Sequence, residues 1–230
     1  MKNSSSLLLG GAALGVGAAL FFSSGLNTQP VANAADKTEN IAEKPAPVVA
    51  AKPGQSTATF AGGCFWSMDA IFNQVKGVES AQSGYAGGKT KNPTYGDVVT
   101  GETGYAETIN IIYNPKVISY NELVDIFLTV HNPTQLNRQG NDVGTQYRSA
   151  IFYRNPQQQK IAAAAIKKPA SAYGWDGKIV TQLASYKKFY RAETHHLDFY
   201  NKNPTNGYCM AVVGPEIAHF KEKFGDRLKK

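Results

Sequence analysis

The residues most able to do covalent chemistry in this chain are its two cysteines, Cys64 and Cys209. Cys64 stands in the stretch FAGGCFWSMD (residues 60–69), after two glycines and before Phe65 and Trp66. A thiol between a strand, a glycine turn and a helix N-terminus lies at the positive end of the helix dipole, where backbone N–H groups stabilise a thiolate. This setting predicts a nucleophile near neutral pH. Taken alone, the same residues also fit a cysteine buried in an aromatic core.

The elements that position Cys64 follow from the pattern around it. Residues 57–60 predict a short strand that runs into Gly62 and Gly63, which leave room for a large substrate atom near the sulfur. After Cys64, apolar side chains recur at helical spacing, as they do in an amphipathic helix. They are Phe65, Met68, Ile71, Phe72 and Val75.

The remaining elements predict a mixed α/β fold. Ser119 and Glu122 form a capping box, Asn155 is a helix N-cap, and residues 107–113 alternate as in a half-buried strand. The predicted strands are 78–85, 107–113, 147–154 and 178–184, the predicted helices are 120–131 and 156–168, and residues 132–146 form a polar loop. The order is β-α-β-β-α-β-α-β, and its first six elements make a split β-α-β, ferredoxin-like unit.

Composition favours one domain with an N-terminal extension. The chain has 230 residues, of which 42% are hydrophobic, enough for one well-buried core. The net charge of +7 comes from scattered basic residues that gather at 221–230, a pattern typical of a solvated helix face and not of a nucleic-acid site. The sequence has no Cys-x-x-Cys motif and no metal-ligand cluster, so we expect neither a metal nor a cofactor.

The N-terminus has the features of a targeting segment. An uncharged apolar run at 7–22 follows Lys2, and Ala32 and Ala34 supply the small residues of a cleavage site. We expect residues 1–34 to be a signal peptide, with an uncleaved membrane anchor as the alternative. Residues 35–56, rich in Ala, Pro and Lys, predict a linker, and 57–230 the catalytic domain. The protein is therefore expected to be exported, to the periplasm or the medium, either free or anchored.

Six blocks of sequence, in one order, resemble the A-type peptide methionine sulfoxide reductases. They are GCFW (63–66), GYAGG (84–88), NPTY (92–95), TGYAE (103–107), HNPT (131–134) and LNRQGNDVGTQYRS (136–149). The resemblance extends from about Thr57 to Phe220. It implies a two-layer α/β sandwich around a ferredoxin-like core, which agrees with the predicted element order, and a monomer.

The chemistry that the resemblance implies is thiol-dependent reduction of methionine-S-sulfoxide, free or in oxidised proteins, as a repair reaction. A sulfoxide has an electrophilic sulfur, a polar S–O bond and a small methyl group, so its reductase needs a thiolate, a proton donor and an apolar methyl pocket. The resemblance assigns Cys64 as the nucleophile and Glu107 as the proton donor, an acid whose pKa is raised by burial. It places Phe65 and Trp66 in the methyl pocket. Tyr85 and Tyr147 would donate hydrogen bonds to the sulfoxide oxygen, and Asp142 would contact the substrate or the water network of the thiolate.

Without the resemblance, each of these residues has a simpler interpretation. Glu107 is then a surface strand residue, Tyr85 and Tyr147 are ordinary strand aromatics, and the segment 140–144 is a turn. The chain departs from the family pattern in the helix predicted after Cys64. There Asp69 replaces the usual glutamate, which shortens the side chain by one methylene. Ser67 also excludes the family variant with a second cysteine three residues after the first.

Cys209 matches the family's resolving cysteine, which condenses with the sulfenic acid left on the nucleophile. A thioredoxin-like protein would then reduce the disulfide, and Pro204 and Gly207 mark a segment able to move. The alternative is a permanent disulfide, in keeping with an even cysteine count in an exported protein.

Two other classes of function remain at this point. A cysteine hydrolase would need a histidine base, and four histidines are available: His131, His195, His196 and His219. A binding module stapled by a disulfide would need no chemistry at all.

Overall fold

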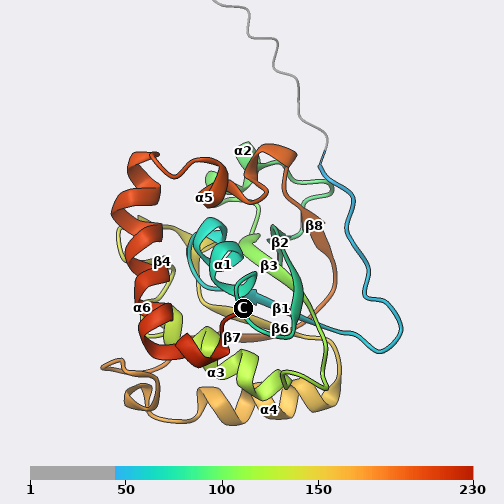
Figure 1. Cartoon of the computed structure of the whole chain (residues 1–230). Coiled ribbons are helices and arrows are strands. Elements are labelled where there is room, and N and C mark those ends of the chain that lie inside the picture. The colour runs from blue at the N-terminus through green and yellow to red at the C-terminus, as the bar shows by residue number, and fades with distance from the viewer. Residues whose placement is uncertain (1–44, 230) are drawn as a thin grey trace, which may run out of the picture. The chain divides into compact units, whose positions relative to one another are not determined.

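The structure is a computed structural model that describes residues 45–229, and its centre is a six-stranded sheet (Figure 1). The strand order is β7-β6-β1-β3-β2-β8. The four inner strands are antiparallel and have the order of a split β-α-β unit, which confirms the predicted ferredoxin-like core. The strands are β1 (Ser56–Ala61), β2 (Val78–Ala86), β3 (Ala106–Tyr113), β6 (Ala150–Tyr153), β7 (Gln182–Ser185) and β8 (Phe189–Arg191).

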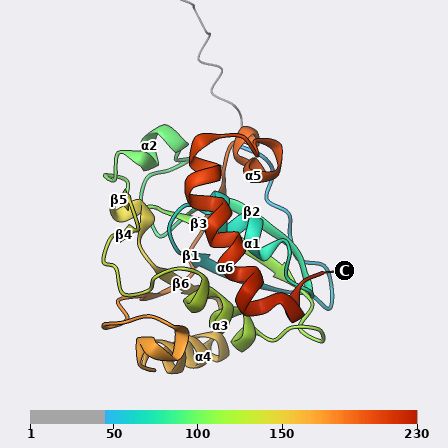
Figure 2. The same cartoon turned by 60° about the vertical axis from the view of Figure 1, so that its left-hand side comes forward.

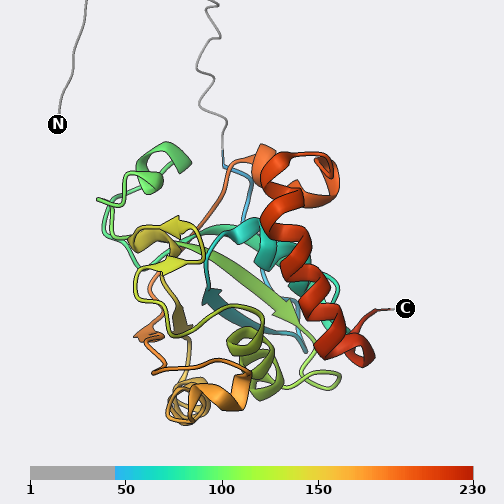
Figure 3. The same ribbon diagram turned by 90° about the vertical axis from the view of Figure 1, so that its left-hand side faces the viewer.

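The helices begin where polar side chains cap their first turn. Ser119 accepts a hydrogen bond from the backbone N–H of Glu122, and Asn155 accepts one from Gln158, as the sequence predicts. The helices are α1 (Phe65–Phe72), α2 (Tyr95–Val99), α3 (Tyr120–Val130), α4 (Pro156–Ile166), α5 (Phe199–Lys202) and α6 (Gly214–Phe224). The long C-terminal helix α6 packs across α1 and α3 (Figures 2 and 3).

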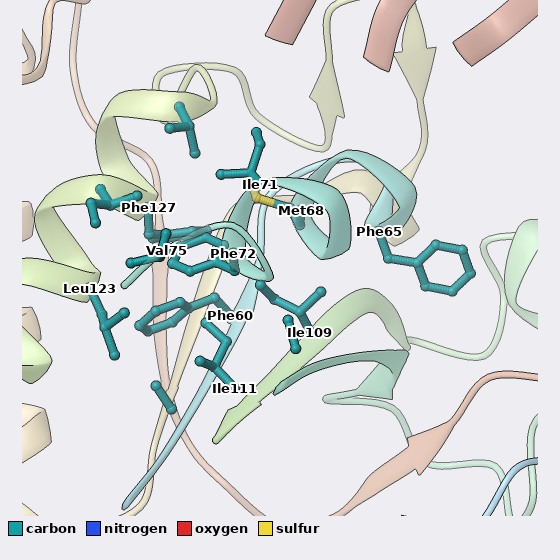
Figure 4. Packing of buried hydrophobic residues seen from close by; sticks show 14 of the residues in the cluster. Phe60, Phe65, Met68, Ile71, Phe72, Val75, Ile109, Ile111, Leu123 and Phe127 are labelled. Atoms are coloured by element: carbon teal, nitrogen blue, oxygen red, sulfur yellow. The ribbon is translucent and has the colours of Figure 1, made fainter. Parts of the chain in front are cut away.

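The core lies between the sheet and helices α1 and α3 (Figure 4). The ring of Phe60 on β1 stacks on that of Phe127 on α3, with 4.8 Å between centroids, and also contacts Phe72 on α1. The opposite face of the strands is also covered, by a smaller apolar cluster around Phe152 and by Arg154, which donates a hydrogen bond to Asn110 of β3. Every residue of β3 is therefore buried, and the prediction of a half-buried strand was wrong because both faces of β3 are covered.

Several elements differ from their predicted bounds. The strand predicted at 147–154 begins only at Ala150, because Thr145–Tyr147 form a 3₁₀ turn. The strand predicted at 178–184 begins at Gln182. The polar loop 132–146 contains a short hairpin of β4 (Arg138–Gln139) and β5 (Asp142–Val143).

The chain already packs against the sheet before β1. Val49 exchanges two backbone-to-side-chain hydrogen bonds with Gln82 of β2, of 2.9 and 3.1 Å. The predicted signal peptide at 1–34 and residues 35–44 of the predicted linker lie outside the described residues, so these boundaries stay predictions. Between residues 45 and 229, no helix combines the length and the apolar character needed to cross a membrane.

Candidate active site

Cys64 lies at the point where β1 turns into α1. Gly63 has a φ of +89°, and a Cβ atom on it would lie 2.6 Å from the side chain of Gln139. A Cβ on Gly62 would lie 2.4 Å from Met68. The two glycines thus allow a tight turn against packed neighbours, and this turn places Cys64, almost fully buried, as the N-cap residue of α1.

A pocket of about 350 Å³ opens above the Cys64 side chain. Its lining residues are Cys64, Phe65, Trp66, Tyr95, Glu107, Asp142, Tyr147, Asn206 and Tyr208. Six of the eight residues expected at the site are therefore brought together, from elements far apart in the sequence. Tyr85 and Cys209 are not among the lining residues.

Glu107 is buried at the floor of this pocket and is not the surface residue of the simpler interpretation. Its side chain is 2% exposed, and its Oε2 atom accepts a hydrogen bond of 3.0 Å from the backbone N–H of Phe65. The pKa of Glu107 is raised to about 8, chiefly by burial and to a smaller extent by the charge of Asp142, against the Phe65 hydrogen bond, which lowers it. The carboxyl group is therefore protonated at neutral pH and able to donate a proton.

The thiol of Cys64 is also held in its neutral form. Burial raises the pKa of Cys64 well above its ordinary value, and the charge of Glu107 adds to this where that carboxyl group is ionised. The backbone N–H of Trp66 and the Tyr208 hydroxyl oppose this by hydrogen bonding to the sulfur. The sequence argument that the helix N-terminus makes this thiol nucleophilic near neutral pH was incomplete, because burial outweighs the helix end.

An aromatic wall forms the apolar side of the pocket. The ring of Trp66 lies flat on Phe199 of α5, with 3.7 Å between centroids, and its Nε1–H donates a 3.3 Å hydrogen bond to His196. Phe65 packs against Tyr95 at 6.3 Å and points away from the main core (Figure 4). These contacts fix both rings beside the sulfur of Cys64.

The expectation that Tyr85 is a pocket hydroxyl was wrong. Tyr85 is fully buried and donates a 2.8 Å hydrogen bond to Oε2 of Glu193. The other oxygen of Glu193 accepts a 2.7 Å hydrogen bond from the backbone N–H of Tyr95, which lines the pocket instead. Tyr85 thus supports the pocket indirectly, through Glu193 and the N-terminus of α2.

Tyr95 and Tyr208 are the pocket hydroxyls that sequence reasoning missed. The signal for Tyr95 is the capping box of Thr94 and Asp97, which begins α2 at Tyr95 and so fixes its position. Tyr208 directly precedes Cys209, and its hydroxyl donates a hydrogen bond to Asp142. Burial raises the pKa of Tyr95 to about 12, so its phenol stays a hydrogen-bond donor at neutral pH.

Cys209 lies just outside the pocket, at the start of a π-helical turn (Cys209–Val213) before α6. Its side chain is fully buried, and its backbone N–H donates to the side chain of Asn206. Both cysteines are free in the structure, so the permanent disulfide of the alternative interpretation is not formed. A bond between Cys64 and Cys209 therefore requires their sulfur atoms to come closer together than in this structure.

The described residues do not support a hydrolase site or a metal site. No histidine lines the pocket, and His131 is buried elsewhere with its Nε2 atom 2.8 Å from the Ser149 hydroxyl. This arrangement gives no support to a cysteine hydrolase. Within residues 45–229, no group of three metal-ligating side chains comes together. Asp69 is buried and accepts a hydrogen bond from the backbone N–H of Asp198, which ties α1 to the segment before α5.

Comparison with known proteins decides between the remaining interpretations, since residues 56–228 match the family model described as peptide methionine sulfoxide reductase. The chain belongs to this family. It is 48% identical over 172 residues to peptide methionine sulfoxide reductase MsrA of Saccharolobus solfataricus, covering 75% of this chain and 96% of the relative. It is 50% identical over 167 residues to the MsrA of Pasteurella multocida, covering 73% and 95% of the two chains.

Solved structures agree with this assignment. The reduced form of Mxr1 from Saccharomyces cerevisiae superposes with a TM-score of 0.64 at 34% identity, over 70% of this chain and 93% of the other. Methionine sulfoxide reductase A of Corynebacterium diphtheriae superposes with a TM-score of 0.60 at 38% identity, over 66% and 77% of the two chains. The protein is an oxidoreductase that reduces methionine sulfoxide with thiols.

Proposed function

We propose that the pocket around Cys64 reduces the S epimer of methionine sulfoxide, both free and within oxidised polypeptides. The observation that carries this proposal is the pairing of a thiol with a buried, protonated Glu107 in one pocket with an aromatic wall. A nucleophile and a proton donor on opposite ends of the S–O bond are what the reduction of a sulfoxide requires.

The reduction begins when the sulfoxide oxygen approaches the Glu107 carboxyl group. As its proton moves to the oxygen, the sulfoxide sulfur becomes more electrophilic and the Cys64 sulfur attacks it. The Cys64 thiol gives its proton to the Glu107 carboxylate as its sulfur bonds to the substrate sulfur. The hydroxyl group then passes from the substrate sulfur to the Cys64 sulfur, while the substrate S–O bond and the new S–S bond both break. Methionine leaves with its sulfur reduced by two electrons, and Cys64 is left oxidised as a sulfenic acid.

The rest of the pocket orients the substrate for this step. The hydroxyl groups of Tyr95 and Tyr147 can donate hydrogen bonds to the developing charge on the oxygen. The rings of Phe65 and Trp66 leave an apolar place for the methyl group. With oxygen toward Glu107 and methyl toward the aromatic wall, a single configuration at sulfur presents its lone pair and S–O bond correctly to Cys64.

Cys209 completes the cycle in this proposal. Its thiol attacks the sulfenic sulfur of Cys64, water leaves, and the two residues become a disulfide that a thioredoxin-like dithiol protein reduces. The position of Cys209 next to Tyr208, which lines the pocket, supports this role. The apolar run at 7–22 supports an exported enzyme that repairs oxidised proteins outside the cytoplasm, free or anchored.

The proposal is tested with the two separated epimers of N-acetylmethionine sulfoxide and dithiothreitol as the reductant. We expect the S epimer to be converted to N-acetylmethionine, and the R epimer to remain, when both are followed by chromatography. Equal loss of both epimers would contradict the assigned pocket geometry. Hydrolysis of the N-acetyl group without reduction would favour the hydrolase instead.

A further inference from the structure

A second cavity, of about 580 Å³, lies beside the active-site pocket and is the larger of the two. The 3₁₀ turn Thr145–Tyr147 separates them: Tyr147 lines the active-site pocket, whereas Thr145 and the next residue, Arg148, line the second cavity. The turn is held against the chain after α2, since the Thr145 hydroxyl donates a 3.0 Å hydrogen bond to the Gly101 carbonyl oxygen. In Figures 2 and 3 the hairpin β4–β5, which precedes this turn, lies next to α2.

A third hollow, of about 240 Å³, continues from the second cavity. The two share Gly87 and Gln182 as lining residues, so they adjoin. Gly87 has a φ of +87°, and a Cβ atom on it would lie 2.8 Å from the Arg148 guanidinium and from the Phe152 ring. A side chain at this position would therefore fill the place where the two hollows meet. We call the two joined hollows the basic trough.

The charges along the basic trough are strongly unequal. Arg148 lines the second cavity, and Lys89, Lys187 and Lys188 line the third hollow, whereas Glu102 is the one acidic residue among the linings of both. No ion pair within residues 45–229 includes any of the four basic side chains. The trough therefore presents four cations to a visiting group.

Arg148 is fixed in place by neutral acceptors. Its guanidinium donates to the Gln182 side chain and to the carbonyl oxygens of Thr145 and Gly104, at 3.0, 2.8 and 3.0 Å. A guanidinium group has five N–H donors, so these three bonds leave two for a ligand. Burial lowers the pKa of Arg148, in keeping with a cation that has lost water without gaining an anionic neighbour.

We propose that the basic trough binds acidic side chains of a polypeptide substrate, close in sequence to the methionine sulfoxide that occupies the active-site pocket. This inference rests on the proposed function. An extended strand advances about 3.3 Å per residue, so a chain that crosses the turn Thr145–Tyr147 reaches the trough within a few residues. Cations spread over two hollows suit several separate carboxylates better than one compact anion. Arg148 takes a carboxylate through its paired donors, and the lysines add charge.

The test measures single-turnover reduction with enzyme in excess and no reductant, so that only substrate binding and reduction contribute. The probes are decapeptides with one central methionine-S-sulfoxide that carry three aspartates before it, three aspartates after it, or asparagines at the same positions. N-acetylmethionine-S-sulfoxide, which is too short to reach the trough, is the reference. We expect one of the aspartate peptides to react about three- to tenfold faster than the asparagine peptide at low concentration, and less so at high salt.

The variant is Lys187→Gln/Lys188→Gln. The matched control is Lys160→Gln/Lys167→Gln, two exposed lysines on α4 and at its C-cap. The trough variant should lose the preference for aspartate while its rate on the reference substrate is unchanged, and the control should keep both. Arg148→Lys, which retains charge but not the paired donors, should lose part of the preference. A wild type without preference, or a preference that survives in the trough variant, would overturn the inference.

Two further outcomes are separated by this design. If the reference substrate is not reduced at all, the proposed function fails, whatever the trough binds. If the trough variant is normal in single turnover but slow only when a thioredoxin-like protein recycles it, the trough binds the reductant, and the inference about the substrate is wrong.

Discussion

At the scale of single residues, the proton on Glu107 controls the chemistry. We predict that Glu107→Gln slows the reduction step by about 10²–10⁴-fold, because an amide cannot donate a proton to the sulfoxide oxygen. In wild type the same step should slow above about pH 8, where Glu107 loses its proton. Rapid-quench measurement of methionine formed in one turnover, from pH 6 to 10, checks both. Glu222→Gln, at an exposed position on α6, is the control. An unchanged rate in Glu107→Gln would remove this residue from the role.

A second prediction concerns Tyr95, which lines the pocket, and Tyr85, which does not. Tyr95→Phe should slow reduction by about 10²-fold, since it removes a hydroxyl that faces the substrate oxygen. Tyr85→Phe should slow it much less, because the Tyr85 hydroxyl acts only through Glu193. Single-turnover rates of the two variants, with circular dichroism to confirm folding, give the comparison. If Tyr85→Phe reduced the sulfoxide more slowly than Tyr95→Phe, the Tyr85 hydroxyl would be the one that contacts the substrate oxygen.

The family resemblance was sufficient to predict that Cys64, Glu107 and the aromatic pair share one site, and the structure places them around one pocket. The resemblance was not sufficient to choose between the phenols. Tyr85 pairs directly with Glu107 across strands β2 and β3, so its position in the sheet looks suitable. Only the packing of Phe65 and Tyr95 above it shows that Tyr85 lies beneath the pocket.

At the scale of elements, the π-helical turn at Cys209–Val213 carries the cysteine that we expect to reach Cys64. We predict that Cys209→Ser reduces about one equivalent of sulfoxide per enzyme and then fails to turn over with a thioredoxin-like protein. Dithiothreitol should restore part of the rate, because a small thiol reaches the sulfenic acid directly. Product counts in the first turnover and in steady state test this. Normal turnover of the variant with the protein reductant would show that Cys209 does not resolve the sulfenic acid on Cys64.

Elements were predictable where a local signal was strong. The capping residues Ser119 and Asn155 located α3 and α4, and the alternation of β3 located the central strand. The hairpin β4–β5 and helix α5 were not predicted, because two-residue strands and a four-residue helix carry no measurable periodicity. These short elements supply Asp142 to the pocket and Phe199 to the back of Trp66, so long-range packing positions part of the site.

At the scale of the whole molecule, buried carboxyl groups make stability depend on pH. Burial raises the pKa of Glu107 to about 8 and that of Asp69 to about 7. A carboxyl group whose pKa is higher in the folded state binds more protons folded than unfolded. The free energy of unfolding therefore falls as pH rises, from about 3.8 to 7 for Asp69 and from about 4.5 to 8 for Glu107, by at most about 1.4 kcal/mol per pH unit for each group.

We predict that this loss is smaller in Glu107→Gln, which has no proton to lose at that position. Urea unfolding of wild type and variant at pH 5.5 and 8.5 measures the difference. The variant should lose less stability between the two pH values. If both proteins lose the same amount, Glu107 is ionised in the folded state at neutral pH, and its assignment as the acid is wrong.

The fold as a whole followed from element order, since four antiparallel strands with a helix after the first and third make one ferredoxin-like arrangement. The segments at the edges of the sheet could not be predicted from the element order. Strand β8 pairs with β2, and the segment before β1 joins the residues after β8 through a backbone hydrogen bond from Ala46 to Ala192. Such backbone bonds leave no pattern in side-chain type.

The central claim is that the oxygen passes to Cys64 and that Cys209 then closes a disulfide with it. The most direct measurement is mass spectrometry of the reduced enzyme after one turnover with methionine-S-sulfoxide, with Cys64→Ser in parallel. The account predicts one methionine per wild-type enzyme and a peptide pair joined by Cys64 and Cys209, and neither product from Cys64→Ser. Methionine formed by Cys64→Ser, or a wild type that forms methionine while both thiols stay reduced, would contradict it.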